Sequence, residues 1–323
     1  RETIMAIEHA CVRAVSKPWG STDLRPWSEI EPDGAAIGEL WFQRDDAKAS
    51  EPALLLKLLF TKEPLSIQVH PDDACARSLG LERGKTEAWY VLSAAPGAGV
   101  AVGLKREVTK DELRASIADG SIAELVQWRP ALKGDVVLVP AGTIHAIGAG
   151  LVLAEIQQRS DTTFRLFDHG RQRGLQVDDA MAAAHLGPAG ARTVPKALGD
   201  GRTLLVADPY FVLERLEFAP DSHWELDAEG ETWLLALEGD ARIGPIELSI
   251  GEAVFVEADR AGMRIGPEGL TALLAYSGPE PVRDLMRQMA RDEAGSSTPS
   301  IPRLPPIPAE PVDRPARAME ARS

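Results

Sequence analysis

Short apolar runs recur through the first half of the chain, and each one ends at a glycine, a proline or a polar turn. Runs of this length with such boundaries predict β-strands, because the helices of globular proteins are usually longer. The predicted strands lie at 54–60, 65–69, 88–92, 136–139 and 151–156. We therefore expect the first half of the chain to be mainly β.

Helical spacing is predicted at two places in this half. Thr109 and Glu112 have the spacing of a capping box and precede apolar residues at helical intervals, which predicts a helix inside an insertion at about 105–129. A second helix is predicted over 178–185 and ends before Gly187.

The stretch from Gly134 to Ala146 combines a strand with a specific turn. Pro140, Gly142 and His145 complete the spacing G-x5-P-x-G-x2-H. An apolar strand ends there at a proline–glycine turn, and the turn presents one imidazole at the start of the next strand. This spacing taken alone is typical of cupins.

Three further polar residues join this histidine in a candidate metal site. Gln68 and His70 are two positions apart in a predicted strand, so their side chains point to the same face. Glu87 stands just before the next predicted strand, and His145 belongs to the turn motif. Two imidazoles, one carboxylate and one amide oxygen suit a borderline divalent cation such as zinc, although iron, manganese, cobalt and nickel remain open.

The second half of the chain repeats the strand pattern in a smaller unit. Gly251 and Gly262 stand in the frame of the turn motif, but the proline is replaced and the histidine is absent. We interpret this as a faded, metal-free copy of the first unit, built as a sandwich or barrel. The strands predicted here are 211–218, 232–237, 246–250, 253–256 and 270–276.

These patterns predict three regions. Residues 1–190 form a catalytic, metal-binding unit, and residues 196–279 form the second, metal-free unit. Residues 280–323 are expected to form a short helix, over 282–291, followed by a flexible proline-rich tail.

Composition restricts the classes of molecule that the protein is expected to bind. The chain has 323 residues and a formal charge of −14, which disfavours a nucleic acid or an anionic membrane as partner but leaves room for a local basic pocket. Its two cysteines make no disulfide framework and no cysteine metal site. No apolar run approaches the roughly 20 residues of a membrane span, and no signal-peptide pattern is found, so a cytoplasmic location is expected. The oligomeric state is not predictable.

Two segments carry candidate residues for binding an anion. Polar and apolar residues alternate from Glu155 to Arg171, so some of them face the interior, where Arg165 and Arg171 can neutralise an anion. The alternative is a polar surface loop. Lys57 interrupts an apolar strand and needs either an anionic partner or an edge position from which it reaches water. Glu39 is a further candidate for the pocket wall.

Together, these motifs resemble the type I mannose-6-phosphate isomerases, in particular their short bacterial form, which belong to the cupin superfamily. The resemblance covers most of the first 171 residues in family order. It rests on KPWG at 17–20, IGELW at 37–41, LLLKLL at 54–59, LSIQVHPDD at 65–73, GKTEAWYVL at 84–92, GDVVLVPAGTIHAIGAG at 134–150 and LAEIQQRSDTTFRLFDHGR at 153–171.

The resemblance implies a tandem cupin, that is, two jelly-roll β-barrels with a small helical insertion. It implies an isomerase that interconverts mannose 6-phosphate and fructose 6-phosphate through a zinc-stabilised cis-enediol, with one Zn²⁺ per chain. The implied zinc ligands are Gln68, His70, Glu87 and His145.

The resemblance also implies roles around the metal. Arg165 is the implied catalytic arginine, with Glu155 in the same pocket, and Lys85 lies near the reacting carbons. Lys85 and Glu155 are both candidates for the general base, and the sequence does not choose between them. The residues implied near the substrate phosphate are Ser66, Lys57 and Arg171, the last of which is often lysine in the family.

Two other functions are weighed against this one. An iron-dependent cupin dioxygenase usually offers a His-x-His pair, whereas Gln68 takes the first place here. A sugar-binding cupin without catalysis would not need the four candidate ligands together with Arg165.

Overall fold

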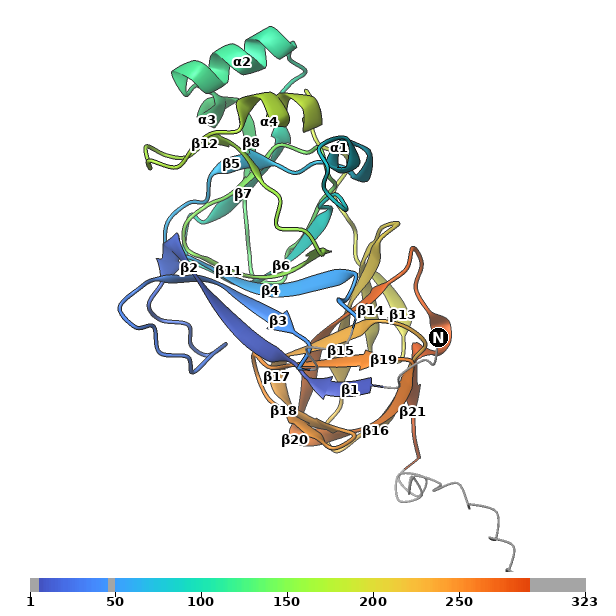
Figure 1. Ribbon diagram of the computed structural model, residues 1–323. Helices are drawn as coiled ribbons and strands as arrows, with labels where there is room; N and C mark the ends of the chain where they lie inside the picture. The colour runs from blue at the N-terminus through green and yellow to red at the C-terminus, as the bar shows by residue number, and fades with distance from the viewer. Residues whose placement is uncertain (1–5, 46–49, 291–323) are drawn as a thin grey trace, which may run out of the picture.

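The computed structural model describes residues 6–45 and 50–290, and strands dominate it as predicted (Figure 1). Two antiparallel sheets enclose the first barrel. The strands of the larger sheet, in spatial order, are β2 (Cys11–Ser21), β3 (Ile37–Gln43), β4 (Leu54–Thr61), β11 (Leu151–Gln158), β6 (Glu87–Ala94) and β9 (Val136–Val139). Those of the smaller are β12 (Phe164–Phe167), β5 (Ile67–Val69), β10 (His145–Ile147), β7 (Gly99–Leu104) and β8 (Val126–Pro130).

A third sheet forms the second barrel-like unit. Its interior is filled by apolar side chains, including Leu226, Val254 and Leu274. The strands along its main path are β1 (Ala6–His9), β19 (Ala253–Glu257), β17 (Thr232–Ile243), β20 (Asp259–Ser277), β15 (Phe211–Phe218), β14 (Arg202–Ala207) and β13 (Lys196–Gly199). The strands that branch from it are β16 (His223–Ala228), β18 (Ile246–Leu248) and β21 (Met286–Gln288).

Short helices cover one end of the first barrel (Figure 1). They are α1 (Asp73–Ser78), α2 (Lys110–Asp119), α3 (Ile122–Leu125) and α4 (Val177–Ala183). The predicted capping box is present at α2, where Thr109 accepts from the Glu112 amide and Glu112 accepts from the Thr109 amide. Leu113 and Ile117 of α2 pack into a cluster with Ile67 and Leu166 of the smaller sheet.

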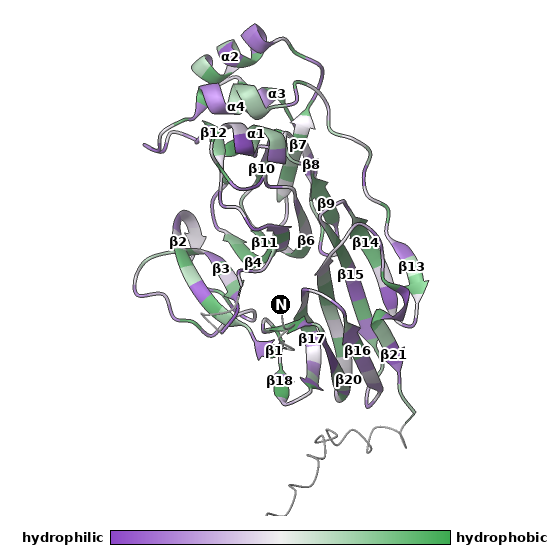
Figure 2. Cartoon of the chain, turned by 45° about the vertical axis from the view of Figure 1, so that its right-hand side comes forward, coloured by the Kyte–Doolittle hydropathy of each residue, from purple (hydrophilic) through white to green (hydrophobic). Residues whose placement is uncertain are grey.

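Strand β4 is buried on both faces, which explains its almost continuous apolar sequence (Figure 2). Leu56 and Leu58 pack in one cluster with residues of the second unit, including Phe211 and Trp233. The alternate positions face the interior of the first barrel, where Leu59 packs. Lys57 shares this alternate face and therefore points into the barrel.

Two features differ from the predictions. Strand β1 pairs with β19, so residues 6–9 extend the second unit although the prediction placed them with 1–190. The helix predicted over 282–291 is wrong within the described residues, where a 3₁₀ turn at Arg283–Leu285 is followed by β21. Extended pairing of β21 with β16 takes the place of helical hydrogen bonds there. The predicted tail from 291 lies outside the described residues.

Several strands were missed because their sequences are polar or short. β2 exposes most of its first residues, and β8 and β12 do not have long apolar runs. Within the described residues, no helix has the length and apolar character to cross a membrane.

One buried carboxylate connects the two units. Glu231, just before β17, accepts hydrogen bonds from the backbone amides of Ala53 (2.6 Å) and Leu54 (2.9 Å) at the start of β4. The indole Nε1 of Trp233 donates to the same carboxylate at 2.9 Å. Burial raises the pKa of Glu231, and the three donors compensate part of the cost of burying it.

Glu231→Ala should lower the free energy of unfolding by about 2–4 kcal/mol, because it leaves three buried donors without an acceptor. Urea denaturation followed by tryptophan fluorescence measures the change. The matched control is Glu238→Ala, which removes an exposed carboxylate of β17 that pairs with Lys133 across the same two units. The control should cost less than about 1 kcal/mol. Equal losses in both variants would contradict the role given to Glu231.

Candidate metal centre and substrate pocket

The predicted metal ligands lie on strands β5, β6 and β10 or directly at the end of one of them. His145 opens β10 directly opposite Gln68 of β5, and Glu87 opens β6. His70 follows β5, and its carbonyl accepts from the Gly142 amide at 2.8 Å. Gly142 has a φ of +85°, a left-handed conformation that favours glycine. The turn motif therefore fixes one histidine and supports the other.

The two imidazoles and the carboxylate converge on one point inside the barrel. Nε2 of His70 lies 3.3 Å from Oε2 of Glu87, and Nε2 of His145 lies 3.3 Å from Oε1. Their candidate ligand atoms all lie within 4.8 Å of one another, and all three side chains are buried. One cation can therefore contact all three.

Backbone carbonyls orient both imidazoles for binding through Nε2. Nδ1 of His70 lies 2.8 Å from the Thr162 carbonyl, and Nδ1 of His145 lies 2.9 Å from the Thr143 carbonyl. A carbonyl oxygen only accepts, so each Nδ1 carries the hydrogen and each Nε2 keeps a lone pair. Burial lowers the pKa of His70, and it lowers the pKa of His145 to about 3, so both rings are neutral.

The carboxylate of Glu87 is ionised. Burial opposes its charge, but the ammonium of Lys85 outweighs burial and holds the pKa of Glu87 well below its usual value. Oε2 of Glu87 is buried without a hydrogen bond of good geometry, although Nζ of Lys85 lies 2.8 Å away as an ion pair. The lone pair of His70 Nε2 faces Nζ of Lys85 at 3.2 Å, and that of His145 Nε2 faces the amide nitrogen of Gln68 at 3.3 Å. An ionised carboxylate beside two imidazole lone pairs that face positive or N–H groups fits a borderline divalent cation.

Gln68 lies beside this triad, but its amide nitrogen is the nearer atom. Nε2 of Gln68 is 3.3 Å from Nε2 of His145, and Oε1 accepts from the Ser66 hydroxyl at 3.0 Å. A half-turn of the amide brings Oε1 toward the imidazole side, and Ser66 then accepts from Nε2. Gln68 as the fourth ligand stays a prediction.

A row of side chains across four neighbouring strands forms the floor of the pocket. Lys57 of β4 is opposite Trp41 of β3 on one side and opposite Glu155 of β11 on the other. Glu155 is in turn opposite Trp89 of β6. Residues opposite one another in a sheet share a face, so all four side chains point into the first barrel.

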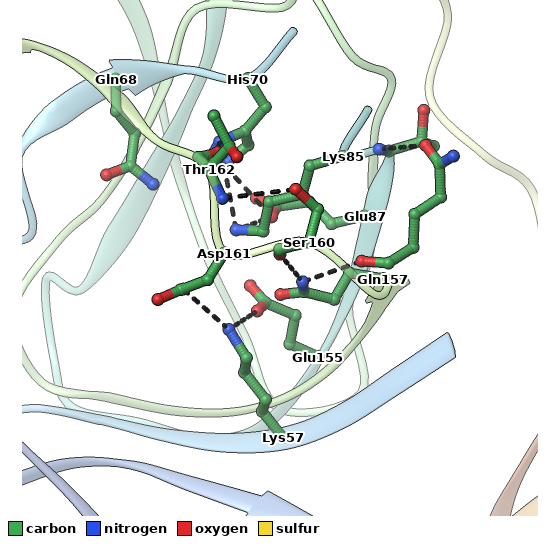
Figure 3. A network of polar contacts seen from close by, with 12 residues as sticks. Lys57, Gln68, His70, Lys85, Glu87, Glu155, Gln157, Ser160, Asp161 and Thr162 are labelled. Carbon is green, nitrogen blue, oxygen red and sulfur yellow. Dashed lines mark hydrogen bonds and ion pairs between the residues drawn. The ribbon is translucent and has the colours of Figure 1, made fainter. Parts of the chain in front are cut away.

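Lys57 is fully enclosed, and the edge-strand alternative is wrong because β4 lies between β3 and β11. Its side chain is 2% exposed. Nζ lies 3.8 Å from Glu39 and 4.6 Å from the centre of the Trp41 ring. It also lies 3.6 Å from Glu155 and 3.8 Å from Asp161, and Figure 3 shows these two ion pairs. Carboxylates surround this lysine.

The two candidates for the general base differ in protonation. Burial, and then the charge of Glu87, raise the pKa of Glu155 to about 7, and Trp89 Nε1 donates to its Oε2 at 3.0 Å. Burial disfavours the charge of Lys85, but Glu87 and Glu155 outweigh burial and raise its pKa. Near neutral pH, Glu155 therefore exchanges a proton readily, whereas Lys85 stays an ammonium.

One cavity joins the metal side to a cluster of arginines. Its lining includes Ser66, Gln68 and Lys85, the floor residues Lys57 and Glu155, and Glu39 beside them. The lining also includes Lys17, Asp161, Thr163, Arg165 and Arg173. Among the described residues, Arg171 is not part of this lining. Its Nη2 instead donates to the Pro64 carbonyl at 2.8 Å and to Asp168 at 3.0 Å.

The sequence analysis did not single out Arg173, Asp161 or Lys17. Arg173 lies two positions beyond the last residue of the resemblance, in a stretch without a motif. Asp161 and Lys17 belong to quoted stretches, but only the three-dimensional structure reveals that they line the cavity. A charged residue type alone does not indicate that its side chain lines a cavity.

A candidate metal-binding triad inside one barrel, followed by a second barrel-like unit, gives the chain the fold of a tandem cupin. Solved structures have the same fold. The mannose 6-phosphate isomerase from Bacillus subtilis is 24% identical, with a TM-score of 0.73 over 85% of this chain and 100% of that one. A mannosephosphate isomerase assigned in Archaeoglobus fulgidus is 19% identical, with a TM-score of 0.68 over 86% of this chain and 99% of that one.

The chain is also related in sequence to mannose-6-phosphate isomerases, as the resemblance predicted. It is 38% identical over 198 residues to the enzyme of Streptococcus mutans, which is 58% of this chain and 62% of that protein. It is 38% identical over 144 residues to mannose-6-phosphate isomerase ManA of Bacillus subtilis, which is 43% of this chain and 45% of that protein. The matched parts thus span less than two thirds of these relatives. No model of a known protein family matches the chain.

His145→Ala should weaken the binding of Zn²⁺ to the metal-depleted protein by at least about 100-fold, because it removes one of three buried ligands. Calorimetric titration with zinc measures the affinity. The matched control is His9→Ala, which removes a half-exposed imidazole of β1 in the second unit. Unchanged zinc affinity in a folded His145→Ala variant would contradict the assignment of this ligand.

Proposed function

We propose that the chain is a metal-dependent aldose–ketose isomerase that interconverts mannose 6-phosphate and fructose 6-phosphate. The observation that carries the proposal is the convergence of His70, Glu87 and His145 beside a cavity that also contains Glu155 and Arg165. The sequence relatives named as mannose-6-phosphate isomerases support the choice of substrate.

The reaction moves a proton between C2 and C1 of the sugar through a cis-enediol. It needs an electrophile at the sugar oxygens, a base for a weakly acidic C–H bond and a positive group near the oxygen that becomes negative. It also gains from a distant contact that orients the sugar, which a cation can provide at the phosphate.

His70, Glu87 and His145 are proposed to hold one Zn²⁺, with Gln68 as the fourth ligand. Bound there, the cation supplies Lewis acidity that polarises the sugar's oxygens at C1 and C2. Two neutral nitrogens and an anionic oxygen suit zinc and ferrous iron alike, so the choice of zinc rests on the amide oxygen of Gln68, which suits a redox-inactive ion.

Glu155 is proposed as the general base that carries the proton between the two carbons. Its pKa of about 7 in the metal-free protein matches proton exchange near neutral pH. Lys85, held as an ammonium by Glu87, is proposed to donate a hydrogen bond to a sugar oxygen. Arg165 is proposed to stabilise the negative charge of the enediolate.

The cavity floor is proposed to bind the sugar's hydroxyl groups. Glu39 accepts from Trp41 Nε1 at 2.6 Å and pairs with Lys17 at 3.2 Å, and Lys57 lies beside it. Such alternating donors and acceptors suit hydroxyls, which both donate and accept. We propose that the protein acts in the cytoplasm, where phosphorylated sugars are formed and where its free cysteines, Cys11 and Cys75, stay reduced.

A coupled assay tests the function directly. Mannose 6-phosphate is converted to fructose 6-phosphate, and the product is followed through glucose-6-phosphate isomerase and glucose-6-phosphate dehydrogenase. Activity should disappear on chelation and return with stoichiometric Zn²⁺. Bound iron together with substrate-dependent oxygen uptake would instead support the dioxygenase, and sugar binding without turnover would support the non-catalytic alternative.

Glu155→Gln should lower kcat by about 10²- to 10⁴-fold with little loss of zinc, because it removes the proposed base but not a ligand. In the unaltered enzyme, kcat/KM should rise with pH through a limb at or below about 7, since the base must be ionised and the cation lowers its pKa further. The variant should lack this limb. A full rate, or the same limb in the variant, would exclude Glu155 as the base.

Arg165→Ala should retain zinc while kcat falls by about 10²- to 10³-fold, the range expected when a group that stabilises developing charge is removed. The matched control is Arg114→Ala on α2, whose exposed guanidinium pairs with Asp178 at 2.9 Å. Its kcat should be unchanged. A similar kcat in both variants would remove Arg165 from the mechanism.

A further inference from the structure

Two arginines share one buried carboxylate beside the cavity. Asp168 accepts from Nε and Nη2 of Arg171 at 3.1 and 3.0 Å. It also accepts from Nε of Arg173 at 2.7 Å and from Nη2 of Arg173. Burial opposes the charge of Asp168, but hydrogen bonds from Arg173 and Arg171 outweigh burial and lower its pKa, so it is ionised. Asp168 therefore fixes the direction of both guanidiniums.

The two guanidiniums have different surroundings. Arg171 also donates to other groups of the protein: its Nη2 lies 2.8 Å from the Pro64 carbonyl, and its Nη1 lies 3.5 Å from Glu63. It ties the segment after β12 to the segment before β5. Arg173 holds Asp168 through one side of its guanidinium and lines the cavity.

Arg165 adds a third guanidinium to the same corner. Its Nη1 donates to the Gly174 carbonyl at 2.9 Å, whereas its buried Nε has no acceptor. Burial, and then the charge of Arg173, lower the pKa of Arg165, which reflects the closeness of two like charges. Two carboxylates, the buried Asp168 and the exposed Glu63, face three guanidiniums here, so this corner has an excess of positive charge.

Lys57 is a poorer candidate for contact with a phosphate. Its ammonium is within 3.8 Å of three carboxylates, those of Glu39, Glu155 and Asp161. A phosphate dianion beside Lys57 would lie close to these like charges, and their repulsion would offset the attraction of a single ammonium.

We propose that Arg173 binds the phosphate of the substrate and that Arg171 is a positioning residue that holds Asp168 in place. The proposal rests on the proposed function and refines it, because it moves the phosphate contact from Arg171 and Lys57 to a residue beyond the resemblance. A guanidinium oriented by a carboxylate presents a planar fork of donors, the geometry that suits phosphate oxygens.

The test compares binding of glucitol 6-phosphate, which cannot isomerise, with binding of glucitol. Calorimetric titrations of the zinc-loaded protein with each ligand measure how much the phosphate adds to affinity. Arg173→Gln should reduce this phosphate-dependent gain by about 10- to 100-fold, the effect of losing a charge-assisted contact. Arg173→Lys should lose less than Arg173→Gln, because a charge remains.

Two further variants separate this role from a structural one. Arg171→Gln should lower the midpoint of thermal unfolding, because it removes the contact to Pro64, yet it should reduce the phosphate-dependent gain less than about threefold. Arg114→Gln, which removes an exposed charge on α2, should change neither quantity. In turnover, Arg173→Gln should raise KM for mannose 6-phosphate much more than it lowers kcat.

Three results would overturn the proposal: an unchanged phosphate-dependent gain in folded Arg173→Gln, a loss in Arg171→Gln as large as that in Arg173→Gln at an unchanged unfolding midpoint, or no gain from the phosphate in the unaltered protein. If Arg173→Gln unfolds, Arg173→Lys decides, and a loss of the gain no larger than that of Arg114→Gln excludes Arg173. Arg173-dependent binding without isomerase activity would refute the proposed function and leave the phosphate site standing.

Discussion

The site depends on one ionised carboxylate buried among neutral imidazoles. Glu87 is almost completely removed from water, and so are His70 and His145. A buried charge is costly unless a positive group compensates it, and in the protein alone Lys85 does so. A divalent cation held as proposed would compensate the same charge more strongly and would also take up the two imidazole lone pairs, which face Lys85 and Gln68 in this structure. The site is thus arranged around positive charge.

The surrounding architecture makes this arrangement rigid. The strands that carry the polar residues belong to sheets with apolar cores, and the larger sheet is covered on its outer face by the second unit. β4 and β11 are thereby buried on both faces. Glu231 attaches the second unit to the start of β4 at Leu54, three positions before Lys57. We interpret the second unit as a support for the floor of the pocket.

Charge is also divided within the cavity. The floor joins Lys57 to carboxylates and suits hydroxyl groups, whereas the corner around Asp168 has an excess of guanidiniums. A sugar phosphate has the same division, with hydroxyls along its length and a dianion at one end. The proposed anionic substrate is therefore compatible with a formal charge of −14, because positive groups are concentrated in this one corner.

Much of this could be predicted from the sequence where local rules act. The turn at Gly142, the capping box at Thr109 and the face shared by Gln68 and His70 all follow from spacing over a few residues. The strand pairings that could not be predicted join segments that are far apart in the sequence. The pairing of β1 with β19 joins opposite ends of the chain, and β21 is extended because β16 offers it an edge.

The candidate site divides in the same way. Its triad lies in recognisable motifs, whereas the difference between Arg171 and Arg173 depends on where the chain turns after β12. Both residues are arginines close to the same carboxylate, and only their surroundings in three dimensions separate the one that contacts Pro64 from the one that lines the cavity.

Anomalous diffraction from zinc-soaked crystals, recorded above and below the zinc absorption edge, tests the central claim most directly. The account predicts a single strong peak in the first barrel, about 2.0–2.2 Å from Nε2 of His70, Nε2 of His145 and a carboxylate oxygen of Glu87. No peak at this position, or a peak held by other residues, would contradict it.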